Sequence, residues 1–133
     1  MPLPNAACLE DFAARYTAAW CSNDPQKVAA FFAPDGFLAI NGGPPAVGHA
    51  GIIPDVKSFM DAFPDLHLVV DKLVPKENTV EYHWTLTGTH SGTGNRVCVS
   101  GYEDWTFNSD GLVSESQGHF DAADYQRQVE GVK

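Results

Sequence analysis

The chain has 133 residues and a formal net charge of −9 at pH 7. A chain of this length buries about two thirds of its unfolded surface, so its core requires neither disulfides nor a metal. The negative charge and the lack of a basic run argue against nucleic acid and anionic membranes as partners, because both would repel the protein. We expect one domain that spans residues 1–133.

Cysteine usage and the N-terminal sequence indicate a compartment. The three cysteines, Cys8, Cys21 and Cys98, are widely spaced and form no close pair of the kind found in zinc sites and redox motifs. Residues 1–7 contain no charged segment and no long apolar run, so they predict neither a signal peptide nor a membrane anchor. The expected location is the cytoplasm.

The first half of the chain predicts three helices. Apolar residues recur at three- and four-residue spacing over residues 8–20, which is typical of one face of a helix. Asp24 and Pro25 form a helix start, and the inner face of this second, short helix comprises Val28, Phe31 and Phe32. A third helix is predicted from about His49 to Phe63, with Pro54 in its first turn or at a kink.

The second half predicts a β-sheet. A short apolar run at residues 37–40 indicates one buried strand before a loop. Four runs with a period of two follow, namely Leu66–Val74, Thr79–Thr89, Val97–Phe107 and Leu112–Phe120. They predict an antiparallel meander, and Asp121 predicts the cap of a last helix that ends near Val129. The order of elements indicates an α+β domain whose curved sheet packs against the N-terminal helices.

The last two runs carry the clearest chemical signal. Glu103 is the one charged residue on a strand face that otherwise carries Val97, Val99, Gly101, Trp105 and Phe107. The turn at residues 108–111 joins the runs as a hairpin. Pairing Phe107 with Leu112 places Trp105 beside Ser114, Glu103 beside Ser116, Gly101 beside Gly118 and Val99 beside Phe120. Large side chains then face small ones, which predicts a pocket.

A second register stays open. A one-residue bulge in the turn would flip the last strand and present Gln117, His119 and Asp121 on the inner face. In that register His119 and Asp121, two residues apart, could act as an acid/base pair. In the register that pairs Phe107 with Leu112, Asp121 caps a helix and His119 lies on the outer surface of the sheet.

Glu103 and Tyr16 are the main candidates for catalysis. Burial raises the pKa of a carboxyl group such as that of Glu103, so that it can stay neutral and donate a hydrogen bond or a proton. Tyr16, on the first helix, could offer its hydroxyl to the same substrate oxygen. The structural alternatives are an ion pair between Glu103 and Arg15 or Arg96, and a tyrosine that simply belongs to the core.

The predicted pocket takes a small apolar ligand. Its expected walls are Trp20, Phe37, Phe59, Phe63, Trp84, Trp105, Ser116, Gly118 and Phe120. No metal site is predicted, because His67, His83 and His90 are isolated from further ligands. No glycine-rich phosphate loop is present either, so we expect no nucleotide and no other cofactor.

The order of several short motifs resembles the NTF2-like superfamily, and within it the SnoaL-like branch. The motifs are Phe32-Ala33-Pro34-Asp35, Phe63-Pro64-Asp65, Gly88-Thr89-His90 with Gly92, Trp105-Thr106-Phe107 before Asp110-Gly111, and Phe120-Asp121 leading to Gln128. The resemblance implies a cone-shaped α+β fold with a strongly curved antiparallel sheet around the helices. That superfamily includes cyclases, ketosteroid isomerases, epoxide hydrolases, dehydratases and non-catalytic binding modules.

The resemblance to ketosteroid isomerases and polyketide cyclases bears on single residues. Tyr16 and Glu103 fall where the isomerases have the tyrosine and aspartate of their oxyanion hole. The general base of that family would fall near Ile40, which cannot take a proton, and the acid of the cyclases would fall at Gln117 or Gly118. The implied function is a cofactor-independent acid/base enzyme of isomerase, cyclase or hydrolase type acting on an apolar carbonyl or cyclic compound. The alternative is a non-catalytic ligand-binding or dimerisation module.

The outer face of the meander predicts a homodimer. This face carries His83, Thr85, Thr87, Tyr102 and Val69. It is too mixed for a core and too apolar for a purely solvated surface, and faces of this kind often pack against a second copy.

Overall fold

The computed structural model describes residues 5–131, which form four helices and six strands. In chain order these are α1 (Ala6–Cys21), α2 (Pro25–Ala29), β1 (Phe32–Ile40), β2 (Ala46–Val47), α3 (Gly48–Ala62), β3 (His67–Pro75), β4 (Val80–Thr89), β5 (Arg96–Phe107), β6 (Val113–Phe120) and α4 (Ala122–Glu130). The α+β class is confirmed. None of the helices in this range is both long and apolar enough to cross a bilayer.

Side-chain caps start two of the helices where the sequence predicts them. Asp24 accepts a hydrogen bond from the amide of Gln26 at 3.0 Å, at the start of α2. Asp121 accepts from the amide of Asp124 at 3.0 Å, at the start of α4. Each carboxylate satisfies an N–H group that the helix leaves without a partner, and each is attracted by the positive end of the helix dipole.

The second helix is shorter than predicted. It ends at Ala29, and Phe32, which was expected on its inner face, begins β1 instead. The carbonyl group of Phe31 accepts a hydrogen bond from the amide of Val113 at 3.0 Å, so pairing with β6 takes over from the helix at this point. In α3, Pro54 lies inside the helix, beyond its first turn.

The six strands form one sheet in the order β2-β1-β6-β5-β4-β3. The antiparallel pairs β3–β4, β4–β5 and β5–β6 confirm the predicted meander. Strand β1 adds to the meander by parallel pairing with β6, a contact that the sequence did not predict. Parallel pairing joins segments that are distant in sequence, so no turn motif between the two strands predicts the contact.

The hairpin of β5 and β6 is shifted by two residues from the predicted register. Phe107 faces Val113 instead of Leu112, because Leu112 belongs to the turn, where its carbonyl group accepts from the amide of Asn108 at 2.8 Å. A bulge between Thr106 and Phe107 adds the second shift. Two shifts leave each side chain on its predicted face. The resulting pairs are Trp105 with Ser116, Glu103 with Gly118, and Gly101 with Phe120.

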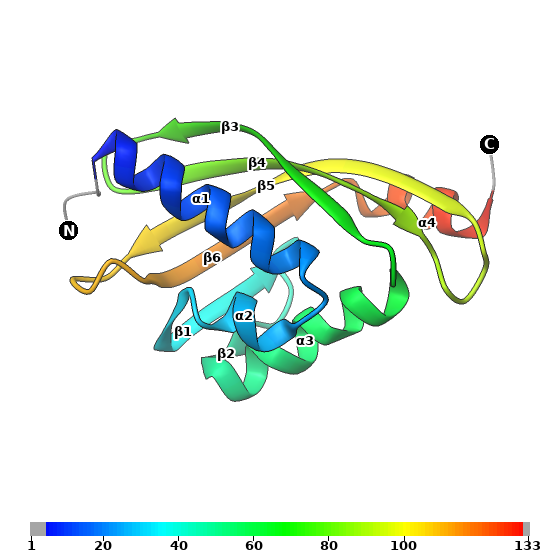
Figure 1. The fold of residues 1–133 in the computed structure, drawn as a ribbon, viewed down its shortest axis with the longest axis horizontal. Coiled ribbons are helices and arrows are strands. Elements are labelled where there is room, and N and C mark those ends of the chain that lie inside the picture. Colours follow the sequence, from blue (N-terminus) through cyan, green and yellow to red (C-terminus); the bar gives the residue numbers. More distant parts are fainter. Residues whose placement is uncertain (1–4, 132–133) are drawn as a thin grey trace.

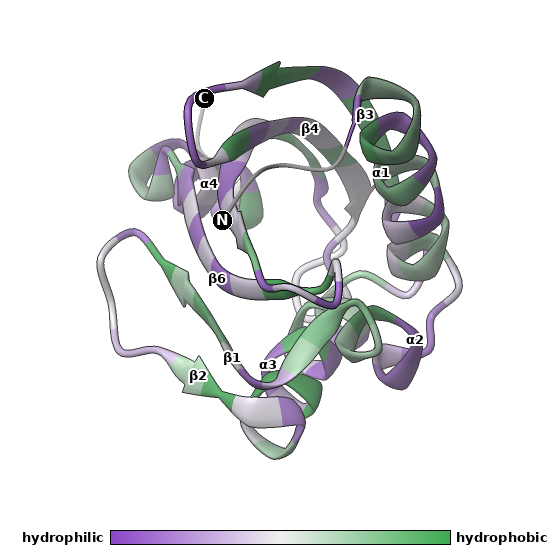
Figure 2. Ribbon diagram, turned by 90° about the vertical axis from the view of Figure 1, so that its left-hand side faces the viewer, coloured by the Kyte–Doolittle hydropathy of each residue, from purple (hydrophilic) through white to green (hydrophobic). Residues whose placement is uncertain are grey.

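The sheet curves around the N-terminal helices. Figure 1 shows α1 crossing the strands, with α2 and α3 below it. In the perpendicular view the sheet curls from β3 round to β2, and α1 and α2 lie on its open side (Figure 2). On the concave face the rings of Tyr82 and Trp105 stack at 4.6 Å, and Tyr16 of α1 packs edge-on against both. This aromatic cluster fixes α1 over the middle of β4 and β5.

Candidate functional site

Glu103 lies in β5 on the concave face of the sheet. Its partners across the strands are Gly118 of β6 and Tyr82 of β4. The residue is only 7% exposed, and among the described residues it is the one charged residue that is buried. Burying a carboxylate is costly unless hydrogen bonds or a cation compensate for the lost water.

Three side chains donate hydrogen bonds to the carboxyl group of Glu103. Tyr16 donates to Oε1 at 2.9 Å and, in a shared bond, to Oε2 at 3.1 Å. Ser116 and Trp105 both donate to Oε1, at 2.8 and 3.1 Å. Oε1 therefore accepts hydrogen bonds from all three side chains, whereas Oε2 accepts only the shared bond from the Tyr16 hydroxyl. We infer that Oε2 is the oxygen left to carry a proton or to exchange one with a ligand.

Burial shifts the pKa values of both Glu103 and Tyr16. Desolvation raises the pKa of Glu103 above that of an ordinary glutamate, and the three hydrogen bonds offset part of this rise. Desolvation, followed by the neighbouring charge of Glu103, also raises the pKa of Tyr16 well above its usual value. The tyrosine therefore remains a neutral donor, and burial favours the protonated form of Glu103 more than in an exposed glutamate.

No cation among residues 5–131 forms an ion pair with Glu103. Arg15, considered as its partner, pairs with Asp11 at 2.9 Å, and Arg96 pairs with Asp65 at 3.2 Å. Both ion pairs lie at the surface, and no salt bridge within residues 5–131 involves Glu103. The hydrogen bonds from Tyr16, Ser116 and Trp105 are thus its only polar support in the described chain.

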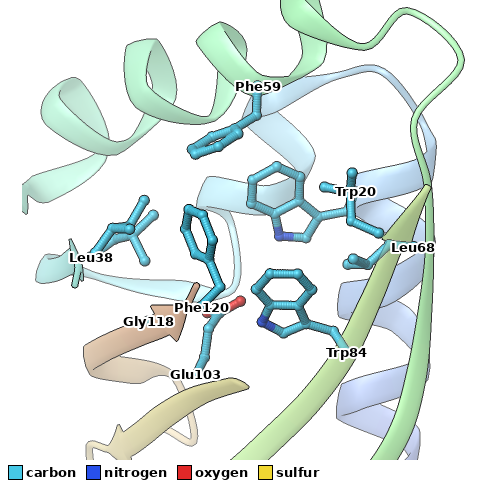
Figure 3. Close-up of a pocket in the computed structure, with 10 residues that line it drawn as sticks. Trp20, Leu38, Phe59, Leu68, Trp84, Glu103, Gly118 and Phe120 are labelled. Atoms are coloured by element: carbon cyan, nitrogen blue, oxygen red, sulfur yellow. The ribbon is translucent and has the colours of Figure 1, made fainter. Parts of the chain in front are cut away.

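A cavity of about 70 Å³ lies beside Glu103. It is lined by Trp20, Leu38, Ile40, Phe59, Leu68, Trp84, Leu86, Glu103, Gly118 and Phe120. Figure 3 shows aromatic side chains from α1, α3, β4 and β6 around the carboxyl group. Since one water needs about 10–15 Å³, the cavity has room for a small organic molecule. Glu103 is the one titratable side chain among its lining residues.

Besides Glu103, the lining carries the indole N–H groups of Trp20 and Trp84, of which that of Trp20 is buried. Trp20 is 8% exposed, and its Nε1 atom has no hydrogen-bond partner within the described residues. The indole lies beside the Tyr16 hydroxyl and lowers the pKa of that group somewhat, but the two do not reach hydrogen-bond geometry. The cavity therefore contains one buried donor without an acceptor.

Five of the expected wall residues line the cavity, namely Trp20, Phe59, Trp84, Gly118 and Phe120. Ser116 and Trp105 do not reach it and instead support Glu103 from behind. Phe63 is fully buried elsewhere, edge-on to His90 and Tyr125. Phe37 of β1 pairs with Val47 and Glu115 and lies outside the lining.

Of the other catalytic candidates, Tyr16 contacts Glu103, whereas His119 and Asp121 do not. Tyr16 reaches Glu103 but does not line the cavity, so its hydroxyl is placed to orient the carboxyl group. His119 lies on the outer face of the sheet, with its ring 4.8 Å from that of Tyr102. Asp121 caps α4. The structure does not bring His119 and Asp121 to Glu103, and the flipped register is not the one present.

Four aliphatic lining residues were not among the predicted walls: Leu38, Ile40, Leu68 and Leu86. Each lies on an apolar strand face, but the sequence pattern does not distinguish a side chain that packs from one that borders a space. Ile40 pairs with Gly118, beside Glu103. At the position where the resemblance would place a general base, the cavity thus has an apolar wall.

This arrangement suits proton transfer. A carboxyl group with a raised pKa, set among apolar side chains, can take a proton from a bound molecule and return it. Residues 5–131 contain no cluster of three or more His, Cys, Asp or Glu side chains that could bind a metal ion.

Comparison with known families and structures is consistent with this geometry. A family model described as a SnoaL-like domain matches residues 13–116. No curated protein matches the sequence.

Solved structures share the fold at low sequence identity. A hypothetical protein with a ketosteroid isomerase-like fold from Catenulispora acidiphila, in complex with trimethylamine, has a TM-score of 0.82 at 16% identity, over 92% of this chain and 94% of its own. AclR, a proposed hydroxylase from Streptomyces galilaeus, has a TM-score of 0.81 at 24% identity, over 97% and 100%. TerC, co-crystallised with polyporic acid, has a TM-score of 0.77 at 17% identity, over 91% and 97%.

Proposed function

The chain belongs to the family of SnoaL-like domains, and from this premise we propose that it is a cofactor-independent acid/base enzyme for a small, largely apolar carbonyl or cyclic compound. The reaction is of isomerase, cyclase or hydrolase type, with a proton transfer through Glu103 as its central step. The family by itself does not decide the activity, because the same fold serves enzymes and binding modules.

One observation carries the proposal: Glu103 is buried, has no cation partner in the described chain and borders an otherwise apolar cavity. A protein seldom retains a buried carboxyl group that only lowers its stability, and pKa shifts of this origin cluster at reactive sites. Tyr16, Ser116 and Trp105 hold the group in one orientation, which a proton carrier requires.

The proposed step uses Oε2 of Glu103. In its ionised form the carboxyl group removes a proton from the carbon next to the ligand's carbonyl group. The C–H bond breaks, an O–H bond forms on Glu103, and the electron pair moves toward the carbonyl oxygen. The proton then returns to the same or another ligand atom. The three hydrogen bonds from protein donors stabilise the ionised form of Glu103 before it takes the proton and after the proton has returned to the ligand.

The test is hydrogen exchange on a simple ketone. We expect the protein to accelerate the exchange of the α-protons of cyclohexanone in D₂O, followed by the loss of their NMR signal. Because the base is the ionised form of Glu103 and burial raises its pKa, the rate should rise with pH across a midpoint above the ordinary glutamate range, and level off beyond it.

A protein-catalysed rate that is flat from pH 4 to 8 would contradict this assignment, as would a midpoint at the value of a solvent-exposed glutamate. Free acetate at the same carboxyl concentration serves as the control for general-base catalysis without a cavity.

A non-catalytic ligand-binding module is the second candidate. It is favoured by the apolar wall at Ile40, where the resemblance would place a base, and by the single titratable residue of the lining. A structural neighbour is described in complex with trimethylamine. In this case cyclohexanone or trimethylammonium would bind, but no α-proton exchange would be accelerated.

The outer face of the sheet supports a proposed homodimer. The rings of His83, Tyr102 and His119 form a row across β4, β5 and β6, at centroid distances of 5.2 and 4.8 Å. Nearby on β3, Val69 is 40% exposed. A second copy packed against this face would bury the aromatic rings and the exposed aliphatic side chain, which would stabilise the dimer.

Sedimentation velocity at micromolar concentration should show a dimer. Val69→Lys should shift the protein to a monomer, because the partner would have to bury the new charge. Val47→Lys, at an exposed valine on β2, is the matched control and should leave the dimer intact. If the unmodified protein sediments only as a monomer, this outer face is not a dimer interface.

A further inference from the structure

The N–H group of Trp20 stands out among the buried polar groups. Its nitrogen is inaccessible to solvent and has no acceptor within the described residues. Buried N–H groups are almost always hydrogen-bonded, because a buried group without a partner has lost its hydrogen bond to water and lowers the stability of the fold. An exception at the wall of a cavity suggests that the partner belongs to whatever occupies the cavity.

The acceptor beside the indole is the Tyr16 hydroxyl, which is not within hydrogen-bond geometry of the Trp20 N–H. Apart from Glu103, no lining side chain carries an acceptor, and the carboxyl group of Glu103 is engaged by Tyr16, Ser116 and Trp105. Figure 3 shows the indole nitrogen of Trp20 on the side of the ring that faces Trp84 and Glu103, away from Phe59. A donor and a proton carrier thus border the same small space.

We propose that the Trp20 N–H donates a hydrogen bond to an oxygen of the ligand, and that the ligands of this cavity are small, neutral cyclic compounds with an acceptor oxygen, such as a ketone. This inference deepens the proposed function and rests on its claim that the cavity receives a small molecule. Trp20 fixes the oxygen, so that a carbon next to it lies toward Glu103.

The chemistry of the proposed step requires such a donor. When a carboxylate removes the α-proton, negative charge develops on the carbonyl oxygen, and a preplaced N–H in an apolar site stabilises that charge. Tyr16 cannot supply it, because its hydroxyl is bonded to Glu103 and does not line the cavity. A hydrocarbon of the same shape would leave the Trp20 N–H unpaired and should be disfavoured for this reason.

The first measurement uses the indole N–H signals in ¹H–¹⁵N NMR spectra, assigned by Trp20→Phe, Trp84→Phe and Trp105→Phe. The probes are cyclohexanone and methylenecyclohexane, which differ by an oxygen in place of a CH₂ group. We expect cyclohexanone to move the Trp20 proton downfield, and methylenecyclohexane to bind without this downfield shift. Failure of both probes to bind, or equal shifts with both, would overturn the inference.

The second measurement is affinity. Trp20→Phe should weaken the binding of cyclohexanone relative to methylenecyclohexane by roughly three- to tenfold, the loss of one hydrogen bond. Phe59→Leu is the matched control, since Phe59 lines the cavity and packs edge-on against Trp20 but has no donor. It should weaken both probes alike. An unchanged preference in Trp20→Phe, or tighter binding of trimethylammonium with the Trp20 signal unmoved, would refute the assignment.

The two proposals can fail separately. A Trp20 shift with cyclohexanone but no accelerated α-proton exchange would support the ligand class and refute the enzyme. Accelerated exchange that Trp20→Phe leaves unaltered would support the enzyme and refute the role of Trp20. If Trp20→Phe does not fold, the downfield shift in the unmodified protein still decides the question.

Discussion

Replacing Glu103 by glutamine is expected to slow the proposed α-proton exchange of cyclohexanone at least about a hundredfold, the usual effect of losing a positioned general base. Glutamine keeps the size of the side chain and accepts hydrogen bonds from Tyr16, Ser116 or Trp105, but it cannot carry the proton. The measurement is the exchange rate at a pH above the midpoint of the profile.

Glu115→Gln is the matched control for this change. Glu115 lies on β6, is exposed and faces away from the cavity, so the variant removes the same charge without touching the site. It should retain the full rate. Equal loss of activity in both variants, or full activity in Glu103→Gln, would show that Glu103 does not carry the proton.

The same substitution should change how stability depends on pH. The pKa of Glu103 is raised in the folded protein, so its favourable contribution is complete below the unfolded pKa and is lost as pH rises through the folded value. Glutamine does not titrate. The melting temperature of Glu103→Gln relative to the unmodified protein should therefore increase from about pH 4 upward. A uniform loss at every pH would instead assign Glu103 a purely structural role.

Replacing Gly101 by alanine is expected to have the largest effect on stability, a loss of about 3 kcal/mol or more. A Cβ atom at this position would overlap the carbonyl oxygen of His119, and would lie 2.8 Å from Cζ2 of Trp84 and 2.9 Å from Cβ of Phe120. The first contact is with the backbone of the paired strand, which cannot rotate away. Because Trp84 and Phe120 line the cavity, the site should be lost with the strand pairing.

Gly118→Ala is the control for that prediction. Its Cβ would lie 3.4 Å from the carbonyl oxygen of Ala39 and 4.0 Å from Cγ of Glu103, which are ordinary contacts. The change in the free energy of unfolding, measured with urea, should stay within about 1 kcal/mol. Equal stability of the two variants would show that β5 and β6 adjust freely around Gly101.

The class of the fold, most element positions and the inner face of the last hairpin are predictable from the amino-acid sequence. Those features depend on periodicity, and the face of a residue in a strand depends only on whether its position is odd or even. Glu103 was therefore placed on the apolar face even though the register was predicted two residues away. The helix caps at Asp24 and Asp121 are also predictable from the sequence, because a capping side chain forms its hydrogen bond within its own turn.

The contacts of Glu103 depend on how the helices and strands pack, and the sequence pattern does not predict them. The hydrogen bond between Glu103 and Tyr16 joins residues 87 positions apart, and depends on how α1 packs across the sheet. Three-dimensional packing also decides the parallel contact of β1 with β6 and the bulge next to Phe107. It likewise leaves the Trp20 N–H without an acceptor within residues 5–131. Side-chain packing in three dimensions decides which apolar residues fill space and which border it, and a one-dimensional pattern does not contain that information.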